Sequence, residues 1–415
     1  MSVQSKTVMI LGAGQLQVPI IQRAKERGLK VVVVSPDADQ PGVPFADAVV
    51  NLDVKDEEGI LAAARKYHID GITTDQTDLP VRTAAYVADK MGLPGIGYDK
   101  WCLFTDKFLM REKCMELGLP TPKYKLAHSL EEAVEATEFV GFPMIIKPVD
   151  SQASHGVSRI DSLDELKCKY QDAVSYSRTG GGVLLEQWIE GIEYSVDSYV
   201  LNGKCTTMSI GQYHPFSLPD VFVSYETVWP ANLPEDTKKL IETTNRKIVE
   251  GFGLVTGRTH AEYMVSNGIC YLVEIGARGG GSYFSSDDVR YVTGISTEDF
   301  LLDFALGEDV APVIHREDIC GCCCTLFFYL PEFGVVQSID GLDQVANYSY
   351  VKRNNLYQIH IGKETCAVVD KGARMFLVVK ADSYEQLEER VNDIRTTLQI
   401  KTVCKDGIVR LPIWR

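Results

Sequence analysis

Short apolar runs alternate with amphipathic segments over the first hundred residues. The runs at 8–11 and 30–34 are almost continuously apolar, which is typical of parallel strands covered on both faces. A Gly-Ala-Gly turn at 12–14 separates the first run from a segment of helical periodicity that extends to about residue 27. Strand, helix and strand in this order predict βαβ units and a doubly wound parallel sheet.

The middle of the chain has a different pattern, which predicts a small α+β region at about 124–195. The elements expected there are a first strand, a helix at 130–137, a strand at 144–147, a loop, a helix at 163–176 and a strand at 183–187. The proline-containing stretch 215–234 is predicted to be rich in loops, and a long helix is predicted at about 235–251.

The remaining pattern, from about residue 315, consists of short β segments followed by one helix at 383–397. The chain is long enough for two or three cores. We therefore predict an α/β and α+β multidomain protein. Its predicted parts are a doubly wound N-terminal domain at 1–100, a central domain at 101–314 that includes a small lid at about 124–195, and a C-terminal α+β domain at 315–415.

Composition and charge restrict the partners and the compartment. Hydrophobic residues make up 45% and charged residues 24%, and the net charge is −15 without a basic cluster. This balance argues against a nucleic-acid partner or an anionic membrane. The N-terminus lacks the pattern of a signal peptide, so we expect a cytoplasmic location and reduced thiols for the 11 cysteines. The cysteine run at 320–324 lacks metal-site spacing and is predicted to be part of a buried strand.

The turn after the first strand resembles a dinucleotide-binding fingerprint, but incompletely. Gln17 occupies the place of the third glycine, which normally permits close packing of helix and strand. We therefore discount a nicotinamide cofactor. The amide groups at the start of this helix still favour an anionic substrate contact.

A set of ionisable residues in one fixed order is the strongest signal. Lys107 begins a helix, Lys147 ends an apolar strand, and a loop of small residues follows at 150–157. Further along, Gly257-x-x-His-x-Glu262 precedes Glu274-Ile-Gly-Ala-Arg278 and three glycines. Two lysines and free loop amides suit a polyphosphate, two glutamates on neighbouring strands suit Mg²⁺, and an arginine beside them suits an anionic intermediate.

This order resembles the ATP-grasp superfamily, and in particular its L-amino acid ligase and carbamoyl-phosphate-synthetase-like branch. The resemblance implies an N-terminal pre-ATP-grasp domain and a central ATP-grasp fold. It implies ATP and Mg²⁺ as cofactors and an acyl phosphate made from a small-molecule carboxylate and passed to an amine. The oligomeric state stays open, with a homodimer among the possibilities.

The resemblance also implies roles for individual residues. Arg278 corresponds to the catalytic arginine, and Glu262 and Glu274 correspond to the metal ligands. The expected ATP contacts are Lys107 and Lys147 on the phosphates, Ser151, Ser154, His155, Gly156 and Val157 in the phosphate-covering loop, Glu186, Gln187 and Ile189 at adenine, and Glu193 at the ribose. The expected substrate contacts are Gly12, Gly14, Gln15, Asp75, Gln76 and Gly280.

The sequence departs from the family pattern at two positions. Gly276 stands where many members have a metal-ligating Asn, and the phosphate loop has the single glycine Gly156. Three other functions compete with the ligase. Bicarbonate activation would fit the same motifs. A nicotinamide dehydrogenase would leave Lys147, Glu262 and Arg278 unexplained. A non-catalytic nucleotide-binding protein would not need the whole set.

Overall fold

The chain divides into two units, each assembled from separate stretches of sequence. The structure, a computed structural model, describes residues 5–152, 154–218, 220–308, 311–368 and 373–415. The first unit consists of the described parts of Met1–Thr121, Ser195–Ile210 and Leu233–Glu317. The second consists of the described parts of Pro122–Tyr194, Gly211–Asn232 and Asp318–Arg415. The three predicted domain boundaries stay predictions.

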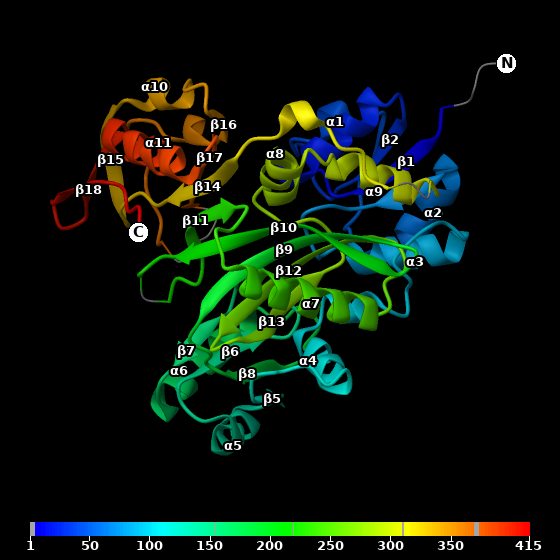
Figure 1. Cartoon of the computed structure of the whole chain (residues 1–415), viewed down its shortest axis with the longest axis horizontal. Helices are drawn as coiled ribbons and strands as arrows, with labels where there is room; N and C mark the ends of the chain where they lie inside the picture. Colours follow the sequence, from blue (N-terminus) through cyan, green and yellow to red (C-terminus); the bar gives the residue numbers. More distant parts are fainter. Residues whose placement is uncertain (1–4, 153, 219, 309–310, 369–372) are drawn as a thin grey trace. The chain divides into compact units, whose positions relative to one another are not determined.

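A parallel sheet covered on both faces opens the first unit, as the apolar pattern predicts (Figure 1). Its strand order is β3-β2-β1-β4, with β1 at Thr7–Leu11, β2 at Lys30–Val34, β3 at Ala48–Val50 and β4 at Gly71–Thr73. Its helices are α1 (Val18–Glu26), α2 (Glu57–Tyr67), α3 (Val81–Met91) and α9 (Thr297–Ala305). Met9 and Leu11 of β1 pack with α2 and α3, whereas Val8 and Ile10 pack with α1 and α9. Both faces of β1 are therefore buried, which explains its continuous apolar run.

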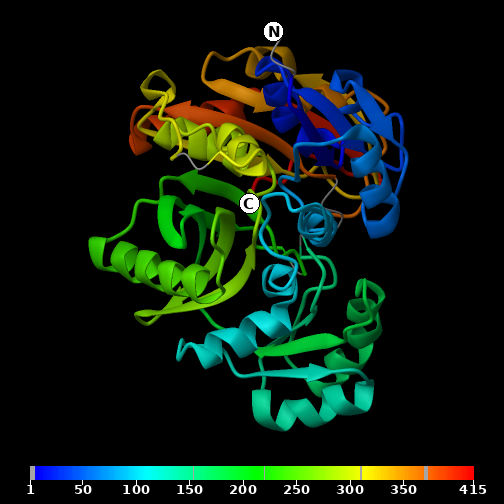
Figure 2. The ribbon, with the colours of Figure 1, turned by 90° about the vertical axis from the view of Figure 1, so that its right-hand side faces the viewer.

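A second sheet in this unit brings the candidate metal ligands together. Its strands here follow the order β13-β12-β9-β10, and β9 and β10 contribute residues to both units. Their bounds are β9 Ile192–Leu201, β10 Lys204–Pro215, β12 Gly257–Ser266 and β13 Ile269–Gly276. The helix α7 (Glu235–Gly251) lies against β12 and β13 (Figure 2), and α4 (Lys107–Glu116) lies against β13. The chain after β13 forms a π-helix (Phe284–Asp288) that leads into α8 (Val289–Thr293).

The second unit begins with the small α+β region that the sequence predicts. Its antiparallel sheet has the order β5-β8-β6-β7, formed by β5 (Tyr124–Ala127), β6 (Met144–Pro148), β7 (Ser158–Ile160) and β8 (Val183–Gln187). The helices α5 (Leu130–Val140) and α6 (Leu163–Ser175) share one core with the sheet. Met144 and Ile146 of β6 belong to that core, so the side chains between them point to the opposite face.

The C-terminal part of this unit is a further α+β arrangement. Its strands are β11 (Ser224–Trp229), β14 (Cys322–Phe328), β15 (Gly334–Asp340), β16 (Val351–Asn354), β17 (Met375–Ala381), β18 (Gln399–Cys404) and β19 (Val409–Arg410). Its helices are α10 (Leu342–Ala346) and α11 (Tyr384–Thr397). Cys322, Cys323 and Cys324 are fully buried in β14, as predicted, whereas Cys320 lies before the strand and is half-buried.

One element departs from the sequence prediction. The stretch 215–234 was expected to be loop-rich, but it contains β11, which pairs antiparallel with both β10 and β14. The prolines lie before and after β11 and only bound the strand. Their number therefore led to a prediction of too much loop. Within the described residues, no helix is long and apolar enough to cross a membrane.

Candidate functional site

Two glutamates face each other across neighbouring strands of the first unit. Glu262 of β12 is directly opposite Glu274 of β13, and the register shifts immediately after this pair. A bulge of this kind re-aims side chains and often occurs beside active sites. Lys107 begins α4, and its Nζ lies 2.9 Å from Oε2 of Glu274. The structure thus brings together both predicted metal ligands and one predicted phosphate-binding lysine.

This carboxylate pair fits Mg²⁺. Like charges directly opposite on a sheet are unfavourable unless a cation neutralises them. No group of three or more His, Cys, Asp or Glu among the described residues is arranged to hold a metal ion. Mg²⁺ is commonly bound by one or two carboxylates together with water and substrate phosphates. Glu262 and Glu274 would therefore supply the protein ligands, and the phosphates of a nucleotide would complete the set.

Arg278 follows β13 and is held by a fork-like ion pair. Its Nε donates to Oδ1 of Asp78 and its Nη2 donates to Oδ2, both at 2.7 Å, while Nη1 donates to the carbonyl oxygen of Gly279 at 3.0 Å. Only 9% of the side chain is exposed. Burial opposes its charge, but the carboxylates of Asp78, Glu274 and Glu262 together outweigh burial and raise the pKa of Arg278. The guanidinium is therefore a fixed positive charge in the site.

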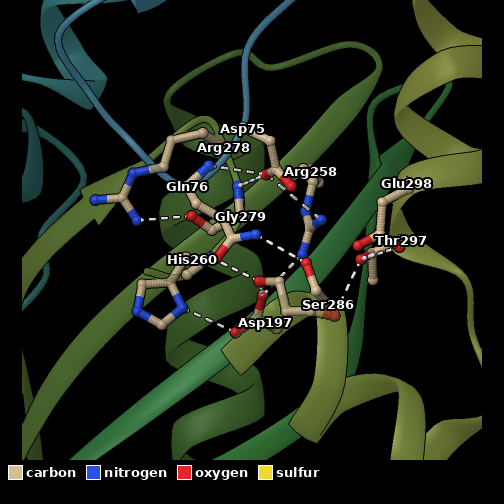
Figure 3. Close-up of polar contacts among 12 residues, drawn as sticks. Asp75, Gln76, Asp197, Arg258, His260, Arg278, Gly279, Ser286, Thr297 and Glu298 are labelled. Carbon is tan, nitrogen blue, oxygen red and sulfur yellow. Dashed lines mark hydrogen bonds and ion pairs between the residues drawn. The ribbon is translucent and has the colours of Figure 1, made fainter. Parts of the chain in front are cut away.

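A buried acid that the sequence did not reveal organises the neighbouring side chains (Figure 3). Asp197 of β9 is fully buried and accepts hydrogen bonds from Nη2 of Arg258 at 3.1 Å and from the hydroxyl of Ser285 at 2.6 Å. It also lies 2.8 Å from Nδ1 of His260. Burial alone would lower the pKa of His260, but Asp197 outweighs it and raises the pKa to about 9. The Nε2 atom of the same ring lies 3.9 Å from Oε1 of Glu262.

The glycines after Arg278 are held tightly by protein groups. The amide of Gly279 donates to Oδ1 of Asp75 at 3.0 Å, and the amide of Gly280 donates to the hydroxyl of Ser285 at 2.6 Å. A Cβ atom at Gly280 would lie only 2.5 Å from Nδ1 of His260, so the backbone can approach the ring only without a side chain. Both amides thus already have protein acceptors here. The substrate role of Gly280 stays a prediction.

The loops after β1 and β4 are tied to each other at the carboxyl edge of the parallel sheet. The side-chain amide of Gln17 donates to the carbonyl oxygen of Asp75 at 2.7 Å, and that of Gln76 donates to the carbonyl oxygen of Leu16 at 3.0 Å. Cβ atoms at Gly12 and Gly14 would each lie 3.2 Å from Oε1 of Gln17. The Gln17 side chain therefore packs against both glycines.

The predicted substrate contacts in these loops differ in their surroundings. Asp75 is fully buried, and Gln76 is also buried, with its amide donating to the Ser286 hydroxyl at 2.8 Å. The carbonyl oxygen of Gln15 accepts from the Tyr283 hydroxyl at 3.2 Å. The contacts of Asp75 and Gln76 favour a role in holding the protein together at this edge. Their contact with a substrate, like that of Gly12, Gly14 and Gln15, stays a prediction.

Three predicted nucleotide residues of the second unit, Lys147, Glu186 and Gln187, lie on its small sheet. Lys147 of β6 and Glu186 of β8 form an ion pair with Nζ and Oε2 2.5 Å apart, and both are buried. They project from the face of the sheet opposite α5 and α6, because their neighbours in sequence fill the helix-covered face. Gln187 is exposed at the end of β8, and Ile189 and Glu193 are half-buried. The nucleotide contacts of these residues stay predictions.

The predicted phosphate-covering loop, 151–157, lies between β6 and β7, and its residue 153 is outside the described residues. Ser154 has a φ of 49°, and its hydroxyl donates to the carbonyl oxygen of Phe222 at 2.9 Å. The exposed His155 ring stacks on Tyr176 with the ring centroids 5.5 Å apart. Gly156 has a φ of 71°, which favours glycine at that position. Ser151 is buried and Val157 is half-buried.

Another buried acid that sequence reasoning missed lies beside the network of Asp197 and Arg258 (Figure 3). Glu298 of α9 is 4% exposed, and burial raises its pKa to about 7. Ser296 caps the same helix, so an acid in its first turn looks like an ordinary helix-start residue. Asp197 gave a clearer signal, because a lone acid within the apolar strand Tyr-Ser-Val-Asp-Ser-Tyr-Val demands a buried partner.

Family models match two stretches of the chain. Residues 5–94 match a ribonucleotide synthetase preATP-grasp domain, and residues 140–287 match an ATP-grasp domain. These matches confirm the predicted fold class. They cover the parallel sheet and most of the residues from the small lid to the Arg278 loop.

Curated relatives include ligases and a formyltransferase. The chain is 30% identical over 185 residues to a formate-dependent phosphoribosylglycinamide formyltransferase of Erythrobacter litoralis, covering 44% of this chain and 47% of that protein. It is 33% identical over 146 residues to a D-alanine–D-alanine ligase of Pseudomonas putida, covering 34% and 42%. It is 27% identical over 267 residues to an alanine–anticapsin ligase of Bacillus subtilis, covering 59% and 56%. The matches thus span about half the length of these curated relatives.

A solved structure matches over nearly the whole chain. The L-amino acid ligase from Bacillus licheniformis superimposes with a TM-score of 0.80 at 25% identity, covering 95% of this chain and 98% of that one. A phosphoribosylglycinamide synthetase from Anaerococcus prevotii has a TM-score of 0.73 at 17% identity, covering 96% and 99%, and shows the same fold.

Proposed function

We propose that this chain, which belongs to the ATP-grasp superfamily, is an ATP-dependent ligase that joins a small carboxylic acid to an amine. The observation that carries the proposal is the grouping of Glu262, Glu274 and Lys107 in the same unit as the buried Arg278. Carboxylates for a metal, a lysine for phosphate and a fixed guanidinium are the groups that acyl-phosphate chemistry needs.

The proposed reaction has two steps. An oxygen of the acid attacks the terminal phosphorus of ATP, the bond to the bridging oxygen breaks, and ADP leaves. The amine nitrogen then attacks the acyl carbon, loses a proton and expels phosphate. Mg²⁺, where bound, would neutralise phosphate charge. Lys107 and Lys147 would hold the phosphates, and Arg278 would stabilise the oxyanion that forms on the acyl carbon.

We favour an α-amino acid as the carboxylic acid substrate. Two relatives carry amino acids in their names, the alanine–anticapsin ligase and the L-amino acid ligase, and the latter matches nearly the whole chain. We further propose a cytoplasmic location.

The test is release of phosphate from ATP with pools of acids and amines. We expect phosphate release only when an acid and an amine are both present. The amount of phosphate should equal the amount of a new amide, which mass spectrometry detects. Formate and bicarbonate serve as competing acids, and turnover with bicarbonate alone would favour carboxylation over ligation. Absence of acid-dependent phosphate release across the pools would contradict the proposed function.

A further inference from the structure

The turn after β4 holds the Arg278 loop at two consecutive points. Asp78 forms the two-pronged ion pair with Arg278, and Asp75 accepts the amide of Gly279. The two segments are 200 residues apart in sequence. Asp75 is fully buried, and its pKa is raised by burial although Arg258 opposes that rise. The parallel-sheet end of the chain thus fixes the position of the residue to which we assign oxyanion stabilisation.

The guanidinium of Arg278 has more N–H donors than its ion pair with Asp78 uses. A guanidinium has five N–H donors. Within the described residues, Asp78 takes one from Nε and one from Nη2, and the carbonyl oxygen of Gly279 takes one from Nη1. One N–H therefore remains on each terminal nitrogen. Because the bidentate pair fixes the plane of the guanidinium, these two donors have a set direction.

The ion pair also balances charge. An unpaired, buried Arg278 would bind the free carboxylate of a substrate strongly, and binding of the ground state does not accelerate a reaction. With Asp78 beside it, the pair is close to neutral toward a distant anion, yet it still offers two aimed N–H groups to charge that develops nearby. This arrangement favours the transition state over the bound acid.

We propose that Asp78 is a positioning residue that aims the two remaining donors of Arg278 at the acyl group and limits their attraction for the unreacted acid. The proposal rests on the proposed ligase function. It differs from a direct substrate contact, in which an acidic turn would bind the ammonium group of an amino acid.

The experiment compares Asp78→Asn and Asp78→Glu with the wild type in acid-dependent phosphate release. Asn keeps one acceptor oxygen but cannot accept both N–H groups, so we expect kcat to fall about 10- to 100-fold, the scale of a misplaced catalytic group. The KM for the acid should stay equal or decrease, and the KM for ATP should not change. The charge-retaining Glu variant should recover part of kcat and serves as a second test if the Asn variant folds poorly.

The matched control is Asp99→Asn, which removes the same charge from an exposed pair with Lys100 in the same unit. This variant should keep wild-type kcat and KM. Each variant is also tested with an α-amino acid and with the analogue that lacks the amino group. A rise in KM for the amino acid alone, with kcat preserved, would overturn positioning in favour of ammonium binding.

The failure of this proposal is distinguishable from failure of the proposed function. Normal kcat in Asp78→Asn, with acid-dependent turnover in the wild type, overturns the positioning role alone. No acid-dependent turnover in the wild type overturns both. As a readout besides activity, the Nε–H signal of Arg278 in protein labelled with ¹⁵N-arginine should exchange slowly in the wild type and rapidly in Asp78→Asn. Equal exchange would also overturn the role of Asp78.

Discussion

Single charged side chains in the first unit are buried with specific partners. Asp197 serves Arg258, His260 and Ser285 at once, and burial would raise its pKa, but His260 and Arg258 together lower it. Removing one partner from such a group leaves a buried charge uncompensated, which typically costs several kcal/mol. Substitutions that keep the shape of each side chain are therefore the informative ones.

The first residue-scale prediction concerns Arg278. Arg278→Lys keeps one positive charge but loses the planar fork that binds Asp78 at two points. We expect ATP affinity close to that of the wild type and a decrease in turnover of about a hundredfold, the scale of a lost oxyanion donor. Calorimetry and phosphate release measure the two quantities. Normal turnover in this variant would show that Arg278 is structural.

The second concerns the buried acid of α9. Burial raises the pKa of Glu298 from 4.5 to about 7, so the folded state keeps it neutral where the unfolded chain ionises it. Its contribution to stability is full below pH 4.5 and is lost as the pH rises to about 7. The Glu298→Gln variant stays neutral at every pH. Its free energy of unfolding relative to the wild type should therefore rise by up to about 3 kcal/mol between pH 4 and pH 8.

Denaturant unfolding at several pH values measures this difference. Glu235→Gln is the control, because Glu235 is an exposed acid of the same unit. A pH-independent difference between Glu298→Gln and the wild type would show that Glu298 ionises normally in the folded protein.

The sequence indicated those candidate site residues whose position in a strand or turn is itself unusual. Lys147 at the end of an apolar strand and Arg278 before three glycines are conspicuous, and the pairing of Glu262 with Glu274 follows from two adjacent strands. Glu298 was missed because an acid is common at a helix start. The partners of Arg278 were missed because contacts across 200 residues leave no local pattern.

At the scale of elements, alternation within a strand decides which residues are available for chemistry. On β6, Met144 and Ile146 pack in the core under α5 and α6, which leaves Lys147 on the other face beside Glu186. A shift of one residue in the pairing of β6 with β8 would bury the wrong set of side chains. The apolar residues of this strand therefore fix the direction of its lysine.

The element-scale prediction concerns this lysine. Lys147→Ala removes a predicted phosphate contact and should weaken ATP binding by about 1.5–3 kcal/mol, measured by calorimetry. Lys125→Ala on β5 of the same sheet is the control, because that lysine is exposed. Unchanged ATP affinity in Lys147→Ala would contradict the assignment.

A second variant separates binding from folding. Lys147→Ala also leaves buried Glu186 without the ion pair, which destabilises the small sheet. Combining it with Glu186→Gln removes the uncompensated charge. The double variant should recover stability without recovering ATP affinity.

Elements were predictable where a periodic pattern extended over several turns or a whole strand. The helix at 235–251 and the strands at 30–34 and 183–187 have the predicted bounds. The strand β11 was missed because its pairing with β10 and β14 comes from distant sequence, whereas the nearby prolines are a local signal.

At the scale of the whole molecule, each unit is assembled from three stretches of sequence. The molecule has a net charge of −15, although two of the three proposed substrates, ATP and the carboxylic acid, are anions. Binding of ATP must therefore depend on local positive groups and Mg²⁺ rather than on the overall field.

The whole-molecule prediction is a magnesium-dependent stabilisation by ATP. A ligand at about 100 times its Kd stabilises the folded state by about 2.7 kcal/mol. We expect ATP with Mg²⁺ to raise the Tm of the wild type, and Glu274→Gln to lose most of the Mg²⁺-dependent part. Thermal melts with and without Mg²⁺ measure it, with Glu235→Gln as the control. An equal Mg²⁺-dependent rise in Glu274→Gln would contradict the metal role.

The long sequence separations within the buried charge network also constrain how the chain folds. Asp78 meets Arg278 across 200 residues and Gln76 meets Ser286 across 210. Contacts of such high order form late, because the entropy of closing long loops must be overcome first. Until then, these charges remain hydrated and Arg278 has no fixed direction. A partly folded chain therefore lacks an aimed arginine, so the proposed transfer of the acyl group to the amine would begin only after these distant segments have met.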